Sequence, residues 1–390
     1  MEAGAFPAAG SRTLSERLAN ALNRFNEAPF AVKAAAGTLL LDLVLVVADR
    51  TPDSLSEWLV LVAIFGITVA ALASLEGRPA AIAAVVLANV VAVLLLYHGV
   101  HDVSQRGING LSLGAIYALG AVGLTLVYGI LKLVNFSHGD LLTFGAYMAY
   151  LVNVTWGLPL IYGIAFAIAL TALLGVALEK GMFAPMRRRG AGVLQLLLMT
   201  LALGFVIRYT IQFAWGTELR QLDINRSAVV ELPGDLRVGR IALIVILVGF
   251  ATLIATGLML RLTLLGKQMR ALSDNLDLAE TSGINTSRVI LFTWIFAAGL
   301  AGLAGVFAGA ITQLQPELGF ELLLPIFAAV VLGGIGNAFG ALTAGLVLGV
   351  VIEWSTLFMA SGLKLVVGFA ILIIVLVIRP EGIFGRARTV

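Results

Sequence analysis

The sequence predicts an all-α membrane protein: a polytopic bundle of transmembrane helices in which some segments are broken or re-entrant. The 390 residues are 60% hydrophobic and only 12% charged, and the mean hydropathy is +1.03. A soluble core of this length could not bury so much apolar surface. Apolar runs of membrane-spanning length also recur along the chain, and two of them are interrupted by polar or glycine-rich residues.

The apolar runs predict eleven membrane segments, because a spanning helix needs roughly 17 to 25 predominantly apolar residues. The first run contains Asp42, so it could instead be an interfacial helix or an accessory element. In order, the segments are 34–48, 58–75, 79–99, 107–131, 141–156, 158–178, 193–215, 241–260, 289–314, a broken pair over 323–354, and 363–378.

Basic residues predict the orientation, because Lys and Arg gather in cytoplasmic loops. They follow positions 178 and 260 and occur in both tails, which places both termini in the cytoplasm and 216–240 outside. This count holds only if 323–354 enters from outside and returns there, with its break in GGIGNAFG at 333–340. The alternative is one long span whose glycines serve helix packing. The basic residues are Arg12, Arg17, Arg24, Lys33, Arg187, Arg188, Arg189, Lys267, Arg270, Arg379, Arg386 and Arg388.

A polar break interrupts the apolar sequence at 132–140, where Asn135, Ser137, His138 and Asp140 occur together. One interpretation is a capped helix start, because Ser137 and Asp140 have the spacing of a capping box. The other is a helix N-terminus within the membrane, whose free amides could hold an anionic group such as a carboxylate.

Residues 266–285 predict a cytoplasmic amphipathic helix that ends near Gly283. Its charges keep one face in water, while four apolar residues fall at helical spacing on the other. A helix that lies on the lipid surface without a partner is the alternative. The charged residues are Lys267, Arg270, Asp274, Asp277 and Glu280, and the apolar stripe is Met269, Leu272, Leu276 and Ala279.

Other motifs argue against an enzyme. The chain has no phosphate-binding G-x-x-x-x-G-K-[ST] loop, no HExxH motif, no Ser/His/Asp set and no cysteine. His98, His101 and Asp102 have metal-like spacing, but a hydrated loop explains them better. Arg208 and Glu353 lie in apolar runs, where an ionisable residue is a functional candidate and a local pair or snorkelling is the simpler account.

Four stretches carry a family resemblance: 109–150, beginning NGLSLGAIYALG, 266–306, beginning GKQMRALSDN, FAAVVLGGIGNAFGALTAG at 327–345, and RPEGIFG at 379–385. They resemble the permeases of branched-chain amino acid (Liv-type) ABC importers, in particular the LivH-like member of the permease pair. The resemblance spans 107–388 as a permease domain. It leaves a cytoplasmic tail at 1–33 and an extension with about three membrane segments at 34–106, without a counterpart.

The resemblance implies a permease subunit for branched-chain or other neutral amino acids in the bacterial cytoplasmic (inner) membrane. It implies a LivM-like second permease, two ATPase subunits that bind the ATP, and a periplasmic substrate-binding protein. This chain itself would hold no cofactor or metal and catalyse no reaction. A permease for urea or short-chain amides, an ion-coupled secondary transporter and a structural scaffold are the alternatives.

The expected functional residues fall into two groups. Those expected along the substrate path are Asn109, Asn135, Ser137, His138, Gly334 and Asn337. Those expected to couple the chain to its ATPase are Lys267, Arg270, Leu272, Leu276, Ala279, Glu280 and Gly283.

Overall fold

The computed structural model describes residues 79–233, 235–378 and 381–383. The expected tail at 1–33 and the expected segments 34–48 and 58–75 lie outside this range. The chain divides into two compact units, Met1–Val93 and Leu94–Val390. Helix α4 (Pro79–Leu131) leaves helical geometry at Gly99, whose φ is 78°.

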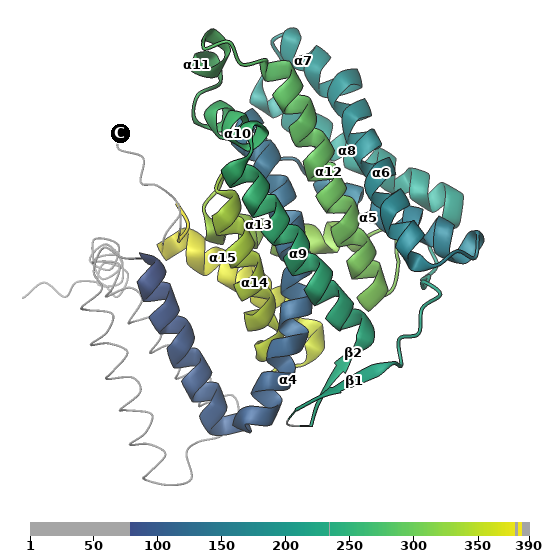
Figure 1. Ribbon diagram of the computed structural model, residues 1–390, viewed down its shortest axis with the longest axis vertical. Coiled ribbons are helices and arrows are strands. Elements are labelled where there is room, and N and C mark those ends of the chain that lie inside the picture. Colours follow the sequence, from purple (N-terminus) through teal and green to yellow (C-terminus); the bar gives the residue numbers. More distant parts are fainter. Residues whose placement is uncertain (1–78, 234, 379–380, 384–390) are drawn as a thin grey trace, which may run out of the picture. The chain divides into compact units, whose positions relative to one another are not determined.

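Helices form almost all of the second unit, which confirms the predicted all-α membrane fold (Figure 1). In the described residues, six helices are long and apolar enough to cross a membrane. After α4 come α5 (His138–Tyr150), η1 (Leu151–Thr155), α6 (Leu160–Leu178), η2 (Glu179–Phe183), α7 (Ala184–Arg188), α8 (Val193–Trp215), β1 (Val229–Leu232), β2 (Leu236–Gly239), α9 (Arg240–Leu262), α10 (Leu264–Asp274), α11 (Leu276–Thr281), α12 (Thr286–Ile311), α13 (Leu318–Gly333), α14 (Ala338–Ser355), η3 (Ser361–Leu363) and α15 (Lys364–Ile378).

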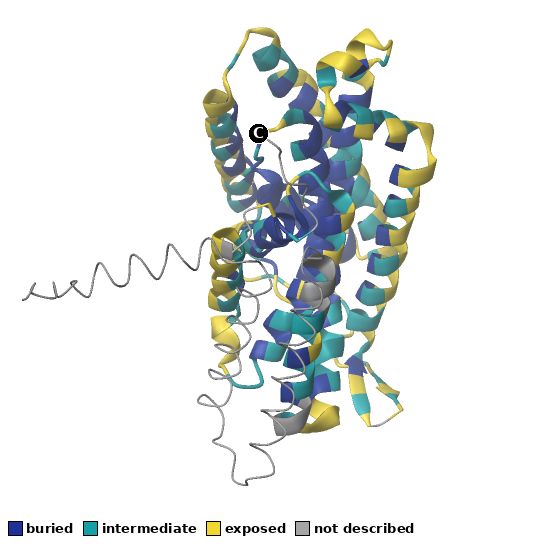
Figure 2. Ribbon diagram, turned by 90° about the vertical axis from the view of Figure 1, so that its left-hand side faces the viewer, coloured by how far each residue is buried: buried dark blue, intermediate teal, exposed yellow. Residues whose placement is uncertain are grey.

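The core of the bundle is formed by α4 and α12, together with α5, which packs against α12. Helices α6, α8 and α9 lie outside them and expose much of their apolar surface (Figure 2). An apolar helix that is exposed all along one side requires lipid or another membrane subunit around it. The burial pattern therefore agrees with a polytopic membrane protein.

Glycines bring the central helices close together. Gly145 of α5 lies against the backbone of Gly302 in α12, and Gly305 lies against the carbonyl of Leu142. Lipid supplies no hydrophobic drive for helix association, so close backbone packing contributes much of the stability. The α5–α12 contact therefore depends on residues that lack a side chain.

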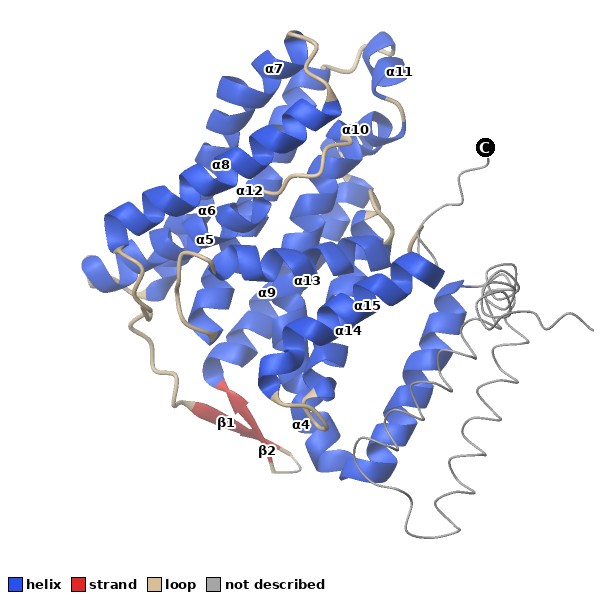
Figure 3. Cartoon of the chain, turned by 180° about the vertical axis from the view of Figure 1, so that it is seen from behind, coloured by secondary structure: helices blue, strands red, loops and turns tan. Residues whose placement is uncertain are grey.

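The two ends of the bundle differ. One end carries α10 and α11, and the other carries the antiparallel hairpin of β1 and β2, which pairs Val229 with Gly239 (Figure 3). Sequence analysis expected only a connecting segment over 216–240. Gln105 of α4 fixes the hairpin, because its Nε2 donates to the carbonyl of Arg237 at 2.7 Å. These ends are called the helix-pair end and the hairpin end below.

A second contact at the hairpin end joins the α8–β1 connection to the α12–α13 connection. Arg220 and Leu314 form an isolated antiparallel bridge, and Arg220 Nη1 donates to the hydroxyl of Tyr150 at 3.0 Å. The hydrogen bond with Tyr150 raises the pKa of Arg220, so this side chain stays charged.

The segment expected over 323–354 is two helices, α13 and α14, and the single-span alternative is wrong. Gly334 and Gly336 in the connecting turn have φ of 91° and 90°, which glycine adopts readily. Asn337 Oδ1 accepts from the amide of Gly340 at 3.1 Å and caps α14. The turn reaches the helix-pair end of α4, where Gly129 lies near both Ser273 and Gly336.

The far ends of α13 and α14 lie at the hairpin end. Trp354 Nε1 donates to the carbonyl of Val103, two residues before Gln105, and α13 begins just after the Arg220–Leu314 bridge. The chain then runs back through α15, and the amide of Ile383 donates to the carbonyl of Leu332. The pair therefore enters from and returns to the hairpin end, as the charge count requires.

The glycine contact between α5 and α12 yields a stability prediction. Gly305→Ala should destabilise the protein by about 1–3 kcal/mol, because its new methyl group would overlap the Leu142 carbonyl. Gly299→Ala on the same helix is the control, because its methyl group would meet only Ile168 at an ordinary 3.5 Å. Thermal unfolding in detergent measures both, and equal midpoints would contradict the packing described.

The broken pair yields a topology prediction. Ile335→Cys in the turn should react with a membrane-impermeant thiol reagent from the same side as Asp277→Cys in α11, while Ser361→Cys should react only from the opposite side. All three positions are exposed, and the natural chain has no competing cysteine. Labelling of Ile335→Cys and Ser361→Cys from one side would restore the single-span alternative.

Candidate functional site

The polar residues that open α5 lie deep in the bundle. Asn135, Ser137, His138 and Asp140 are almost completely buried. The Ser137 hydroxyl donates to Asn135 Oδ1 at 2.7 Å, and His138 Nε2 donates to the carbonyl of Gly120 in α4 at 3.0 Å. Burying so many polar groups in an apolar bundle requires partners for them, and most of them have one. The start of α5 is therefore an ordered polar turn.

The expected capping box is not formed. Ser137 occupies the N-cap position, but its side chain makes no capping hydrogen bond, because it bonds Asn135 instead. The amide of Phe136 donates to the hydroxyl of Thr200 in α8 at 3.2 Å. Asn135 Nδ2 is buried without a hydrogen-bond partner among the described residues. The helix start is thus held by the Ser137–Asn135 hydrogen bond within the turn and by contacts with neighbouring helices, and not by a capping box.

Asp140 forms a buried ion pair with Arg208 of α8. Arg208 Nε donates to Asp140 Oδ1 at 3.0 Å, and the side chains are 11% and 3% exposed for Arg208 and Asp140. The guanidinium also lies over the ring of Phe320, 4.5 Å from its centroid. The local-pair interpretation of Arg208 is confirmed, and snorkelling is not needed. A charged pair inside a membrane bundle is energetically expensive, which makes this pair a candidate for a functional position.

Four residues of α8, spaced four apart, face the polar turn and its neighbours; we call them the α8 seam. They are Thr200, Gly204, Arg208 and Gln212. Thr200 meets the turn, Gly204 lies against Ser137 and Asp140, Arg208 binds Asp140, and Gln212 Nε2 donates to Glu317 Oε1 at 2.8 Å. Sequence analysis missed this seam, although small or polar residues at four-residue spacing in an apolar helix are its signal.

The six residues expected along the substrate path do not form one site. Their positions can be compared along helix α4. Asn109 lies on α4 near the hairpin end, and His138 bonds Gly120 of α4. The turn that holds Gly334 and Asn337 approaches Gly129 of α4. At 1.5 Å of rise per residue, the three levels are separated by roughly 16 Å and roughly 14 Å. Only Asn135, Ser137 and His138 come together, at the middle level. Their role in transport stays a prediction.

Glu353, the second charged residue noted in an apolar run, also has a local pair. Its carboxylate lies 2.5 Å from Lys364 Nζ and 3.9 Å from Arg106 Nη1. These contacts join α14 to α4 and α15 near Trp354, at the hairpin end. Glu353 therefore serves the packing of that end, away from the α8 seam.

The single amphipathic helix expected over 266–285 is instead two helices, α10 and α11. Asn275 between them is extended, and its Oδ1 accepts from the amide of Leu278 at 3.0 Å to cap α11. Gly283 follows α11 with φ of 84°, as its expected capping position requires. The break at Asn275 lets the two short helices turn over the ends of α9 and α12, which they contact.

The apolar stripe of this helix pair is covered by the chain itself. Met269, Leu272 and Ala279 are buried in the main core, and Leu276 is half-buried. The charged residues face outward and are exposed: Lys267, Arg270, Asp274, Asp277 and Glu280. Their coupling role stays a prediction, but the surface offered to a partner is the charged one together with exposed Leu278.

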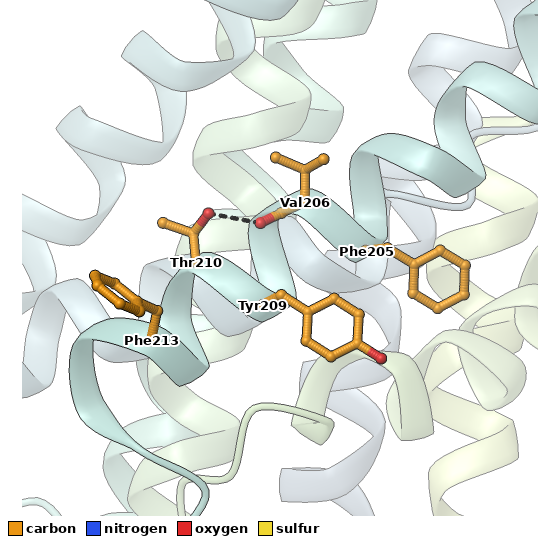
Figure 4. Close-up of a pocket in the computed structure, with 5 residues that line it drawn as sticks. All are labelled: Phe205, Val206, Tyr209, Thr210 and Phe213. Carbon is orange, nitrogen blue, oxygen red and sulfur yellow. Dashed lines mark hydrogen bonds between the residues drawn. The ribbon is translucent and has the colours of Figure 1, made fainter.

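A metal site is absent from the part of the chain that the structure describes, where no three suitable side chains converge. His101 and Asp102 form an exposed pair, with Nδ1 and Oδ1 3.2 Å apart. The hollow shown in Figure 4 lies on the outer side of α8. It is lined by Phe205, Val206, Tyr209, Thr210 and Phe213.

The Asp140–Arg208 pair yields a stability prediction. Asp140→Asn should cost about 3 kcal/mol or more of unfolding free energy, because it leaves a mostly buried guanidinium without its counterion. Adding Arg208→Gln should cost much less than the sum of the two single changes. Unfolding midpoints in detergent are measured for the two single variants and the double variant, with exposed Asp277→Asn as the control. Additive losses would show that the two charges do not interact.

Comparison with known proteins places the chain. A family model described as the permease component of a branched-chain amino acid transport system matches residues 107–376. LivH of Escherichia coli (strain K12), a high-affinity branched-chain amino acid transport system permease protein, is 31% identical over 295 residues, which cover 72% of this chain and 95% of LivH. BraD of Pseudomonas aeruginosa is 32% identical over 302 residues, with the same coverage.

A related permease of the other type is more distant. LivM of Salmonella typhimurium is 25% identical over 314 residues, which cover 73% of this chain and 72% of LivM. No solved structure matches the chain. The match to the family model and the identity to LivH and BraD together show that the chain belongs to the family of branched-chain amino acid transport permeases.

Proposed function

We propose that this permease carries branched-chain or other neutral amino acids across the bacterial cytoplasmic membrane as the LivH-like subunit of an ABC importer. The similarity to LivH and BraD, which are permeases for branched-chain amino acids, supports the substrate class. In this proposal, separate ATPase subunits drive alternating access, both termini of this chain are cytoplasmic, and residues 107–388 form the permease domain behind a tail at 1–33 and an extension at 34–106.

The partners follow from the same comparison. LivH and LivM relatives are two kinds of permease, which supports a heterodimer of this chain with a LivM-like subunit. The chain has no phosphate-binding loop, which supports ATP binding on two other subunits and no cofactor or catalysis in this one. A periplasmic binding protein would deliver the substrate at the hairpin end.

The observation that carries the proposal is the position of the α10–α11 pair at one end of the bundle. Its charged surface is exposed, while its apolar stripe is fixed to the spans. A force applied to the exposed surface therefore acts directly on α9 and α12, which the pair contacts. Such a rigid connection is what an ATPase needs to move transmembrane helices.

A second connection leads from the helix pair toward the polar turn. Lys132 Nζ donates to the carbonyl of Ser273 in α10 at 2.9 Å, and Lys132 immediately precedes the segment that opens α5. Arg270 also donates to the carbonyl of Leu260 at the end of α9. Movement of α10 would thus be passed both to α9 and to the start of α5.

The coupling role yields a binding prediction. Leu278 is 63% exposed, so Leu278→Asp should leave the fold intact and weaken ATPase binding by about tenfold or more, as loss of a central interface residue does. Leu219→Asp is the control, because Leu219 is 61% exposed in the α8–β1 connection. Co-purification of the ATPase and ATP-dependent uptake are the measurements. Equal ATPase binding by both variants would contradict the coupling assignment.

The energy source distinguishes an ABC importer from an ion-coupled secondary transporter. Uptake of labelled leucine into cells should survive collapse of ion gradients while ATP is kept available, and should stop when ATP is depleted. The reverse pattern would favour the secondary transporter. Uptake of urea or acetamide in place of leucine would favour the short-amide alternative.

A further inference from the structure

The guanidinium of Arg208 is only partly used by its ion pair. Its Nε binds Asp140, while Nη1 and Nη2 have no hydrogen-bond partner among the described residues. Neither nitrogen is among the buried polar atoms that lack a hydrogen-bond partner, so both are accessible at the surface of the bundle. A guanidinium carries five N–H groups in a planar fork that matches a carboxylate. Arg208 thus binds Asp140 through Nε, while Nη1 and Nη2 form a free edge that is available to a ligand.

Glu317 lies at the start of the neighbouring helix α13, and its carboxylate has no cation paired with it among the described residues. Its Oε1 accepts from Gln212 Nε2, and it forms no ion pair among the described residues. It is close enough to Asp140 for the two carboxylates to interact electrostatically. Two carboxylates and one guanidinium leave this cluster with one unbalanced negative charge, which an ammonium group would neutralise.

The free edge of Arg208 and the carboxylate of Glu317 lie about one helical turn apart. Gln212, which binds Glu317, follows Arg208 by four residues in α8, and Phe320, which packs on Arg208, follows Glu317 by three. Residues three or four apart on a helix are neighbours, about 5–6 Å between Cβ atoms. An α-amino acid with each charged group about 2.8 Å from its partner bridges roughly 8 Å, a distance that two long side chains starting one turn apart can span.

Aromatic rings border the same position. Arg208 lies between the rings of Phe320 and Phe205, 4.5 Å and 5.6 Å from their centroids. Phe205 stacks on Tyr209, and these two rings form the wall of the hollow seen in Figure 4. Phe205 and Phe320 are 51% and 45% exposed, so an apolar side chain of a ligand could pack on them.

We propose that Arg208 and Glu317 form a binding site for a zwitterionic α-amino acid, with the carboxylate on the free guanidinium edge, the ammonium on Glu317 and the side chain on the Phe205 and Phe320 rings. The inference rests on the proposed function and specifies the site that recognises its substrate. A purely lipid-facing surface would not need an open guanidinium beside an unpaired carboxylate.

Binding to the purified membrane complex of permeases and ATPases, free of the substrate-binding protein, tests the site. Labelled leucine is displaced from the complex by leucine, by isocaproate, which lacks the ammonium, or by isoamylamine, which lacks the carboxylate. Leucine should displace at least about tenfold better than either analogue, because each analogue leaves one charged group unpaired. Glu317→Gln should remove the advantage of leucine over isocaproate, and Arg208→Lys should reduce the advantage over isoamylamine.

Both variants keep the local structure. Glu317→Gln still accepts from Gln212, and Arg208→Lys still places a cation near Asp140, so the size-exclusion profiles of the assembled importer should match that of the natural protein. Thr252→Val is the control, because Thr252 lies on α9, outside the proposed site, and its hydroxyl bonds only the carbonyl of Val248. Its leucine affinity should not change.

Three outcomes would overturn the inference. Leucine affinity unchanged in both Arg208→Lys and Glu317→Gln would show that the site lies elsewhere, with the amino-acid function intact. Equal weakening for leucine and both analogues in each variant would show a structural role only. If the natural importer takes up no amino acid but takes up urea or acetamide, the proposed function fails and the zwitterion site fails with it.

Discussion

The start of α5 inside the apolar bundle is the constraint on which the arrangement depends. A helix that begins at membrane depth exposes polar backbone and side-chain groups that no lipid can satisfy. Three neighbouring helices supply contacts here: α4 through Gly120, α8 through Thr200 and Arg208, and α13 through Gly319, whose amide donates to the Thr143 hydroxyl. The polar turn therefore fixes where these helices cross α5.

The polar turn also determines how α8 is attached to the rest of the bundle. Its contact with α5 combines apolar packing with hydrogen bonds and one ion pair, while its other side is exposed and aromatic. The polar groups at such a contact can exchange one partner for another, including a ligand of matching charge. Apolar packing alone provides no alternative partners of this kind. In the proposed function, a conformational change started at α10 would reach α8 through Lys132, which bonds α10, and through the polar turn that follows it, which α8 contacts.

Much of the fold was predictable from hydrophobic length, charge bias and glycine signals. Those signals gave the spans, the break at Gly334 and Gly336, and the helical end at Gly283. The site was less predictable, because Asp140 and Arg208 are 68 residues apart and the sequence alone does not show that they meet. The polar turn was expected, but its capping box was not formed, because Ser137 bonds Asn135 within the turn and Asp140 pairs with Arg208 of α8. The break at Asn275 was also missed, because a continuous apolar stripe fits one helix or two.

The central claim is that the charge pair at the α5–α8 contact holds a guanidinium ready for the carboxylate of the transported amino acid. Solid-state NMR of the reconstituted importer tests it directly, with carboxyl-labelled leucine and nitrogen-labelled arginine in this chain. The account predicts dipolar contact between the leucine carboxylate and a guanidinium in the natural protein, and its loss in Arg208→Lys. The same contact in Arg208→Lys, or none in the natural protein with leucine bound, would contradict it.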